Sequence, residues 1–319
     1  MQLQIVKPFP GIEYAYSNNT KLVKEILSNR ILIDGKFHIL NVFDDVNIKI
    51  ALRDKSKKDF RFEQIDALIL DAIGSLYDNG IYYFTTDMIA RMIYQNVHHR
   101  VTAQVKQNIQ VRIDAMLDLQ IRLNIEDEYI KRESIPKDIR LQKKQYTCFL
   151  PLKPIDVVFS ANSRKGKGYH LYQSPLIWEY GKYTKQIVSF QFDAFSFLKR
   201  NITIESLLIL RNVYRRIETM KNTNNNVFNR KICLYRIENK IHKGLLPECN
   251  INPTDFKNWN DKHRKICQLV ELFLDYSKKQ RTNRCESKTT NTIVPTLGKA
   301  TRLFSMAKII TKIIKNKEI

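Results

Sequence analysis

A long predicted helix near the C-terminus carries basic and amide side chains, which are the groups that bind the phosphates and base edges of DNA. It begins at about Pro253 or Lys257 and ends near Ser277. Its inner stripe is Trp259, Ile266, Val270 and Phe273. At about 100° per residue, the outer face of its first half and the positions beside it hold Lys257, Asn260, Asp261, Arg264, Lys265 and Gln268. Glu271 and Asp275 make the second half acidic. This polarity suits a recognition helix, whose N-terminal half enters the major groove; a solvated helix face is the alternative.

A second predicted helix begins after the capping residue Thr102 and ends at about Leu119. Its core face is Val105, Ile109, Ile113 and Met116, and its outer face is Ala103, Gln104, Gln107 and Val111. On its flanks lie Lys106, Asn108, Gln110 and Arg112. Glutamine can pair with adenine in two hydrogen bonds, and small apolar groups can touch the thymine methyl. We therefore expect a helix that reads A·T-rich sequence, although a neutral surface or a dimer contact fits almost as well.

A cluster of basic residues lies on the predicted helix that begins after Thr203 and ends near Met220. It contains Arg211, Arg215, Arg216 and Lys221. Arginines at these positions could bind phosphates, which position a protein on DNA without reading its sequence. An ordinary solvated face is equally compatible with the pattern.

The sequence offers little for catalysis. His98 and His99 are adjacent, whereas rolling-circle nickases hold their metal with a His-hydrophobe-His motif, so the two side chains would diverge in an extended segment. No GxxxxGK[ST] or GxGxxG motif occurs, and none of the five cysteines is part of a CxxC pair. We expect no enzymatic activity, no cofactor and no metal.

The charge of the chain indicates a polyanionic partner. Lys and Arg number 54 against 32 Asp and Glu, giving a net charge of +22. From residue 201 onward, 24 basic side chains stand against 10 acidic ones. Such an excess fits nucleic acid, an anionic membrane or an acidic protein. No apolar run reaches the ~20 residues of a spanning helix and no signal peptide is evident, so we expect duplex DNA as partner, no membrane and a cytoplasmic location.

The pattern of elements predicts an α+β fold with two winged-helix domains in tandem. A mixed α/β lead segment covers 1–58, with a helix over 20–30, a hairpin over 31–40 and a strand over 46–52. The first winged-helix domain covers 59–155. Its predicted helices are 63–77, 87–94 (capped by Thr86) and 102–119, its strands are 81–84, 121–125 and 146–152, and its wing is 126–144.

The second half is organised similarly. Residues 156–200 are predicted to be connecting strands, with a basic turn at 164–168. The second winged-helix domain covers 201–285, with a strand over 231–236, a short helix within 237–246 and the long helix described above. A basic helical tail over 286–319 follows.

Three stretches of the chain resemble replication initiator-like proteins of plasmids and mobile elements in low-GC Gram-positive bacteria. They are FEQIDALILDAIGSLYDNG (62–80) followed by FTTDMIAR (84–91), LPLKPID (150–156) with GYHL (168–171), and WNDKHRKI (259–266). The resemblance implies two winged-helix domains and binding to origin DNA. It would place recognition on the helix with Lys262, Arg264 and Lys265 and on the helix with Gln104 and Gln107. The tail after Arg281 departs from this pattern, because it lacks an evident second wing.

We therefore expect a sequence-specific duplex-DNA-binding protein that acts as a replication initiator, recruits host replication proteins and could form a homodimer. A transcriptional regulator or a relaxosome accessory protein with the same DNA-binding fold is the alternative. Direct repeats in the DNA beside the gene would favour initiation, and a single inverted repeat at its promoter would favour autoregulation.

Overall fold

The computed structural model describes residues 4–6, 11–28, 32–33, 38–43, 46–53, 59–96, 101–124, 146–159, 165–192, 195, 202–222, 233–238, 241–249 and 251–288. The chain divides into two compact units, Met1–Asp193 and Ala194–Ile319, and each is described by itself. Helices are mixed with small, mostly antiparallel sheets, which confirms the α+β class. No helix in the described part of the chain has the length and apolar character needed to cross a membrane.

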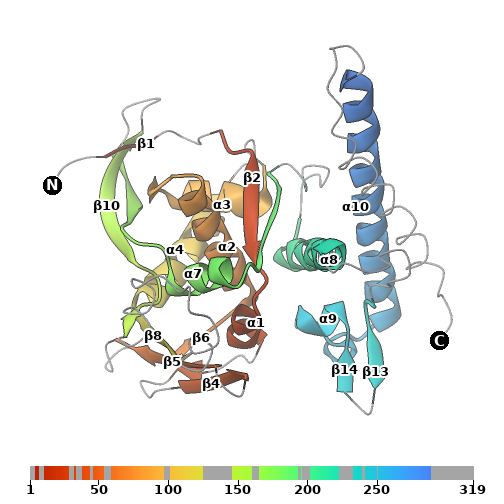
Figure 1. Cartoon of the computed structure of the whole chain (residues 1–319), viewed down its shortest axis with the longest axis horizontal. Helices are drawn as coiled ribbons and strands as arrows, with labels where there is room; N and C mark the ends of the chain where they lie inside the picture. The colour runs from red at the N-terminus through yellow and green to blue at the C-terminus, as the bar shows by residue number, and fades with distance from the viewer. Residues whose placement is uncertain are drawn as a thin grey trace. The chain divides into compact units, whose positions relative to one another are not determined.

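Unit 1 has a helical centre flanked by strands (Figure 1). Its helices are α1 (Lys21–Ser28), α2 (Gln64–Asp78), α3 (Thr86–Tyr94), α4 (Ala103–Leu117) and α7 (Leu176–Tyr183). Its strands are β1 (Gln4–Val6), β2 (Tyr14–Asn18), β3 (Leu32–Ile33), β4 (His38–Phe43), β5 (Val46–Leu52), β6 (Phe60–Arg61), β7 (Tyr83–Phe84), β8 (Leu119–Asn124), β9 (Thr147–Cys148), β10 (Leu152–Phe159), β11 (Lys165–Leu171) and β12 (Ile187–Gln191).

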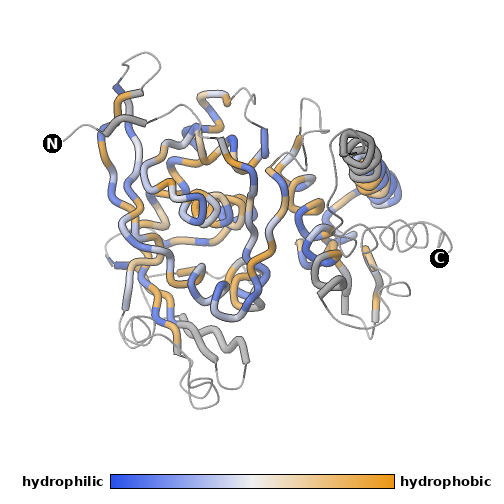
Figure 2. The backbone as a smooth tube through the Cα atoms, turned by 45° about the horizontal axis from the view of Figure 1, so that its top comes forward, coloured by the Kyte–Doolittle hydropathy of each residue, from blue (hydrophilic) through white to orange (hydrophobic). Residues whose placement is uncertain are grey.

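Helix α2 forms the centre of this unit because apolar residues occupy most of its faces, and a helix that is apolar nearly all round is buried. Figure 2 shows the apolar segments gathered in the interior of unit 1. At Gly74 the helix packs directly against the ring of Trp178. Gly80, with φ of 73°, follows the end of the helix in the left-handed conformation that glycine allows. The predicted helix and its ending are thus confirmed.

The next two helices begin at side-chain caps. The Thr102 hydroxyl accepts a hydrogen bond from the Val105 amide at 3.3 Å, as predicted for α4. The cap of α3 is Thr85, which accepts from the Met88 amide at 3.4 Å, so the predicted cap, Thr86, is wrong by one residue.

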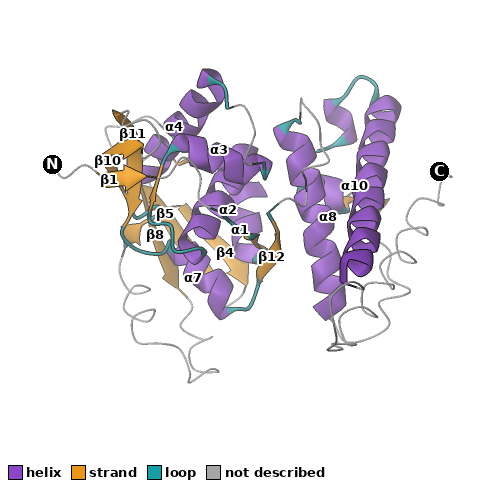
Figure 3. Cartoon of the chain, turned by 90° about the horizontal axis from the view of Figure 1, so that it is seen from above, coloured by secondary structure: helices purple, strands orange, loops and turns teal. Residues whose placement is uncertain are grey.

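One sheet has the strand order β1-β10-β11-β7. β10 and β11 form an antiparallel hairpin, and β11 also pairs with β7, which precedes α3. Figures 1 and 3 show α2, α3 and α4 between this sheet on one side and the β2–β12 pair on the other. The hairpin is therefore an integral layer of unit 1, whereas the sequence had suggested connecting strands from residue 156 onward.

A second sheet, of order β4-β5-β8-β9, joins the N-terminal segment to the middle of the unit. β5 pairs with β8 from Asn47↔Asn124 to Leu52↔Leu119, so the lead segment packs with the helical region and does not stand alone. The predicted hairpin over 31–40 is wrong, because β3 pairs with β6 and β4 pairs with β5. The predicted wing, 126–144, lies outside the described residues.

Unit 2 consists of α8 (Ile204–Asn222), a hairpin of β13 (Arg236–Glu238) and β14 (Ile241–Lys243), the short α9 (Leu245–Glu248), the 3₁₀ turn η2 (Pro253–Asp255) and α10 (Trp259–Lys288). The hairpin occupies much of the stretch where a short helix was predicted, and only α9 is helical there. α10 continues past the predicted end near Ser277. The part of the predicted tail beyond residue 288 lies outside the described residues. The predicted strand 231–236 is wrong over most of its described length, because residues 233–235 are not in a strand and only Arg236 belongs to β13.

The packing of Gly74 against Trp178 predicts how a substitution at this glycine changes the stability of unit 1. A Cβ at Gly74 would lie 2.4 Å from atoms of the Trp178 ring. Replacing a helical glycine with alanine normally stabilises by about 0.5–1 kcal/mol. Here we expect Gly74→Ala to destabilise unit 1 by about 1–3 kcal/mol, because the core is overpacked. Urea unfolding measures the difference. Gly11→Ala is the control and should be nearly neutral, since nothing lies within 4 Å of its added Cβ; a stabilised Gly74→Ala would contradict the packing.

Candidate nucleic-acid interface

The outer face of α4 presents amide and small apolar side chains to solvent. Ile109, Ile113 and Met116 are buried and hold the helix on the core. Exposed along the other side are Ala103, Gln104, Gln107, Asn108, Val111 and Asp114. The predicted outer face is confirmed, with Val111 57% exposed. Gln104 and Gln107 form no hydrogen bond within the described part of the chain, so both amides are available to a ligand.

Lys106 has a structural partner. Its Nζ lies 2.8 Å from Oδ1 of Asp87 on α3, and Nε of Arg91 lies 2.6 Å from Oδ2 of the same carboxylate. Partial burial raises the pKa of Asp87, but the hydrogen bonds and charges of Arg91 and Lys106 outweigh that effect and leave the pKa below its usual value. Lys106 therefore ties α4 to α3, and its half-exposed side chain is less available to DNA than predicted.

Gln110 is half-buried and also has structural partners. Its Nε2 donates to both oxygens of Asp114, at 2.9 and 3.0 Å, and to the hydroxyl of Tyr169 on β11. That hydroxyl donates in turn to Asp114 at 3.2 Å. Burial of Tyr169, and next the charge of Asp114, raise the pKa of the phenol far above its usual range, so it stays protonated. This cluster joins α4 to the β10–β11 hairpin, and the prediction that Gln110 contacts DNA is not supported by its position.

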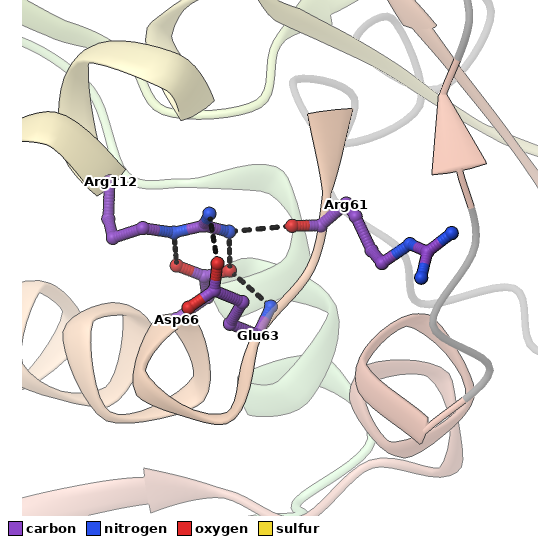
Figure 4. Close-up of polar contacts among 4 residues, drawn as sticks. All are labelled: Arg61, Glu63, Asp66 and Arg112. Atoms are coloured by element: carbon purple, nitrogen blue, oxygen red, sulfur yellow. Dashed lines mark hydrogen bonds and ion pairs between the residues drawn. The ribbon is translucent and has the colours of Figure 1, made fainter. Parts of the chain in front are cut away.

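Arg112 is the strongest departure from the predicted interface (Figure 4). Its guanidinium donates to Asp66 Oδ1 at 2.9 Å, to Glu63 Oε1 at 2.9 Å and to the carbonyl oxygen of Arg61 at 2.7 Å, and it lies over the Phe60 ring. The Arg112 side chain is 12% exposed and that of Asp66 is 0% exposed. Burial raises the pKa of Asp66 while Arg112 opposes the rise, and the two carboxylates raise the pKa of Arg112 despite its own burial. Arg112 is thus a structural ion-pair partner.

The β10–β11 hairpin adds a basic edge at residues that were predicted to form a connecting turn. Lys165 and Lys167 are exposed on β11. They alternate with glycines and share the strand face of Tyr169, the residue that contacts α4. The exposed Asp156 is the register partner of Lys167, which leaves Lys165 as the less neutralised of the two. Figures 1 and 3 show the hairpin beside α4. The alternation of lysine and glycine between two apolar stretches is the feature of the sequence that could have predicted this basic strand.

In unit 2 the first half of α10 presents the predicted polar face. Ile266, Val270, Phe273 and Leu274 are buried. Asn260, Arg264, Lys265 and Gln268 are exposed on the helix, and Lys257 is exposed two residues before its start at Trp259. Asp261 lies between the cations: Lys265 Nζ is 2.8 Å from it, Arg264 also pairs with it, and the Lys265 hydrogen bond holds the pKa of Asp261 below its usual value. With Arg264 and Lys265 side chains 70% and 69% exposed, the face keeps a net positive charge.

Lys262 differs from its neighbours on α10. Its Nζ lies 2.5 Å from Glu205 Oε1, in the first turn of α8, and 4.9 Å from the centre of the Phe256 ring. The contact ties α10 to α8. The prediction that Lys262 contacts DNA is therefore not supported by its position.

The predicted phosphate contacts of Arg211 and Arg215 are wrong in position. Arg211 is 2% exposed and Arg215 is 8% exposed. Arg215 donates to the Asn212 side chain at 3.4 Å and lies near Cys249, whose burial raises its pKa to about 12. α8 is buried on nearly every side because Leu208, Ile209 and Val213 are apolar as well as the predicted stripe. Of the three arginines, only Arg216 is exposed, and it pairs with Glu248; the side chain of Lys221 lies outside the described residues.

Metal ligands are absent from the part of the chain that the structure describes: no group of three or more His, Cys, Asp or Glu could hold an ion there. The adjacent histidines, His98 and His99, lie outside the described residues.

The position of Arg112 predicts a stability defect and an unchanged charge contribution to DNA binding. Arg112→Ala should destabilise unit 1 by about 3 kcal/mol, because it leaves the buried Asp66 carboxylate without its cation. Arg112→Lys should recover only part of the loss, since a lysine lacks the planar fork that reaches two carboxylates. Urea unfolding measures both variants. If Arg112→Ala kept its stability and instead flattened the salt dependence of DNA binding, Arg112 would be a phosphate ligand after all.

Comparison with protein-family models, with curated proteins and with solved structures gave no match to this chain. The geometry and charge of the residues described above are therefore the basis on which its function is assigned.

Proposed function

We propose that this chain is a sequence-specific duplex-DNA-binding protein that reads base edges with α4 and binds phosphates with the β10–β11 hairpin and the first half of α10. The observation that carries the proposal is the outer face of α4. It is a capped, core-anchored helix whose exposed side holds Gln104, Gln107 and Val111 and whose cations are engaged elsewhere. Amides and small apolar groups are what base recognition in the major groove requires.

The order of elements around α4 supports a winged-helix arrangement for unit 1. Helix α2, strand β7, helices α3 and α4 and the hairpin β10–β11 follow one another, and β7 pairs with the second hairpin strand. We place the wing in this hairpin, where Lys165 is exposed beside α4. β8 and β9 would then be an insertion that pairs with the N-terminal strands.

The division of charge supports different roles for the two units. The exposed face of α4 is nearly neutral, whereas the first half of α10 exposes Arg264 and Lys265, and Lys257 is exposed just before the helix. Phosphate contacts supply affinity that is largely indifferent to sequence, and base contacts supply discrimination. Unit 2 accordingly provides affinity and unit 1 provides specificity.

Together with the resemblance of residues 62–91 and 259–266 to replication initiator-like proteins, this arrangement favours a role in initiating replication of a plasmid or mobile element. Such an initiator binds its origin and recruits host replication proteins. A plasmid that carries the gene with its flanking DNA should replicate in a suitable host and should fail to do so with Gln104→Ala and Gln107→Ala. Replication that persists unchanged with a loss of self-repression would instead identify a transcriptional regulator.

The base-reading role of α4 is tested by Gln104→Ala combined with Gln107→Ala. Each amide that reads a base contributes about 1–3 kcal/mol of discrimination, so the ratio of specific to random DNA affinity should fall at least about tenfold. Both side chains are exposed, so stability should change little. Fluorescence anisotropy with origin-derived and random duplexes measures the ratio.

Lys165→Ala is the contrasting variant, because it should weaken both duplexes equally. If the glutamine pair leaves the ratio unchanged and shifts the monomer–dimer equilibrium, α4 is an assembly surface.

The phosphate-binding role of α10 predicts a change in salt dependence. Arg264→Ala with Lys265→Ala should weaken binding to every sequence, and should reduce the slope of log affinity against log salt by about 1.8, or 0.9 for each lost phosphate contact. Titrations between 50 and 200 mM salt, a range suggested by known DNA binders, measure the slope. Lys262→Ala is the matched control on the same helix: it should leave the slope unchanged and lower stability, because it breaks the contact with Glu205.

A further inference from the structure

Two cations face each other on the β4–β5–β8–β9 sheet of unit 1. The register pairs Lys49 of β5 directly with Arg122 of β8, so both side chains project from the same face. The opposite face is the core face, where Ile50, Ile121 and Leu123 are buried. Lys49 and Arg122 are half-buried. Neither has an acidic partner among the described residues.

The sequence of the sheet accentuates this charge. None of the strands HILNVF, VNIKIAL, LQIRLN and TC contains an acidic residue. Like charges directly opposite on neighbouring strands destabilise a sheet. A carboxylate at either position would remove that repulsion and add a cross-strand ion pair. The repulsion between the two cations thus lowers the stability of the sheet. Uncompensated unfavourable interactions of this kind are found mainly at functional sites.

We propose that this face, defined by Lys49 and Arg122, is a further contact surface for the phosphates of duplex DNA. It rests on the proposed DNA-binding function and adds a second region of unit 1 to it. Arginine binds phosphate oxygens with its planar fork and lysine binds them as a point charge. Opposed residues on adjacent strands have Cβ atoms about 4.5–5.5 Å apart, so both cations can serve one phosphate or two successive ones. Gln120, on the same face of β8, is half-buried and offers an amide to the backbone.

Helix α4 ends at Leu117 and β8 begins at Leu119, so the sheet follows the C-terminal end of α4. Figures 1 and 3 show α4 beside the β10–β11 hairpin, whereas β4, β5 and β8 form another side of the unit. A duplex read by α4 would reach the sheet by bending around unit 1, or a second duplex segment would bind there. In both cases the sheet binds the DNA backbone and reads no bases, so its contribution to the binding affinity is independent of the DNA sequence.

The opposed cations allow a charge-swap experiment in which stability and binding move in opposite directions. Lys49→Glu should create an ion pair with Arg122, raise the thermal midpoint of unit 1 by about 1–3 °C and reduce the salt slope of DNA binding by about 1.8, since both cations are neutralised. Arg122→Glu should do the same. The double variant should restore the like-charge repulsion and lose the gain in midpoint while its DNA binding remains weak.

Lys185→Glu is the matched control, because Lys185 is exposed in unit 1 on the turn before β12 and the net charge changes equally. A slope for Lys49→Glu equal to that of Lys185→Glu would overturn the proposal, as would a lowered midpoint in both single variants. If Gln104→Ala with Gln107→Ala loses specificity while Lys49→Glu behaves as the control, this inference alone fails. If the unsubstituted chain binds no DNA, the proposed function fails with it.

Discussion

The ion pair between Arg112 and Asp66 fixes helix α4 on the N-terminus of α2, and the proposed base contacts of unit 1 depend on it. Asp66 is fully buried, so its charge is tolerated only beside a cation that satisfies its oxygens. Two further ties, from Lys106 to Asp87 and from Gln110 to Tyr169, act at other points around the helix. Together with the buried Ile109, Ile113 and Met116, these three contacts set the rotation of α4 about its own axis, which leaves Gln104 and Gln107 facing solvent.

The same three contacts show where sequence reasoning succeeds and where it stops. Helical periodicity placed the outer face of α4 correctly, because the spacing of buried residues along one helix is a local property. It could not show what stands opposite the flanking residues. The partner of Arg112 lies in α2 and that of Gln110 lies in β11, far along the chain, so polar residues that would bind DNA on an isolated helix are instead used in tertiary contacts. The β5–β8 and β7–β11 pairings were missed for the same reason, since strand partners are non-local.

The two helices of unit 2 also differ in how well their exposed faces could be predicted from the sequence. α10 has a single apolar stripe, and its polar face was predicted correctly. α8 is buried on several faces, and Arg211 and Arg215 are buried with it. The extra apolar residues Leu208, Ile209 and Val213 were visible in the sequence and argue for enclosure on all sides. An arginine on such a helix is a poor candidate for a phosphate contact, because its guanidinium is buried in the interior of the unit.

The chain contains two tryptophans, Trp178 and Trp259, and each lies in a different unit. Trp178 is buried against Gly74, and its indole N–H donates to Asp78 at 3.1 Å. Trp259 opens α10 among the rings of Tyr235, Phe256 and His263. Each tryptophan is therefore a fluorescence reporter of one unit. Emission from Trp178 reports on the interior of unit 1, and emission from Trp259 reports on the start of the helix that carries the cations of unit 2. Removing either indole leaves a spectroscopic label on the other unit without any added dye.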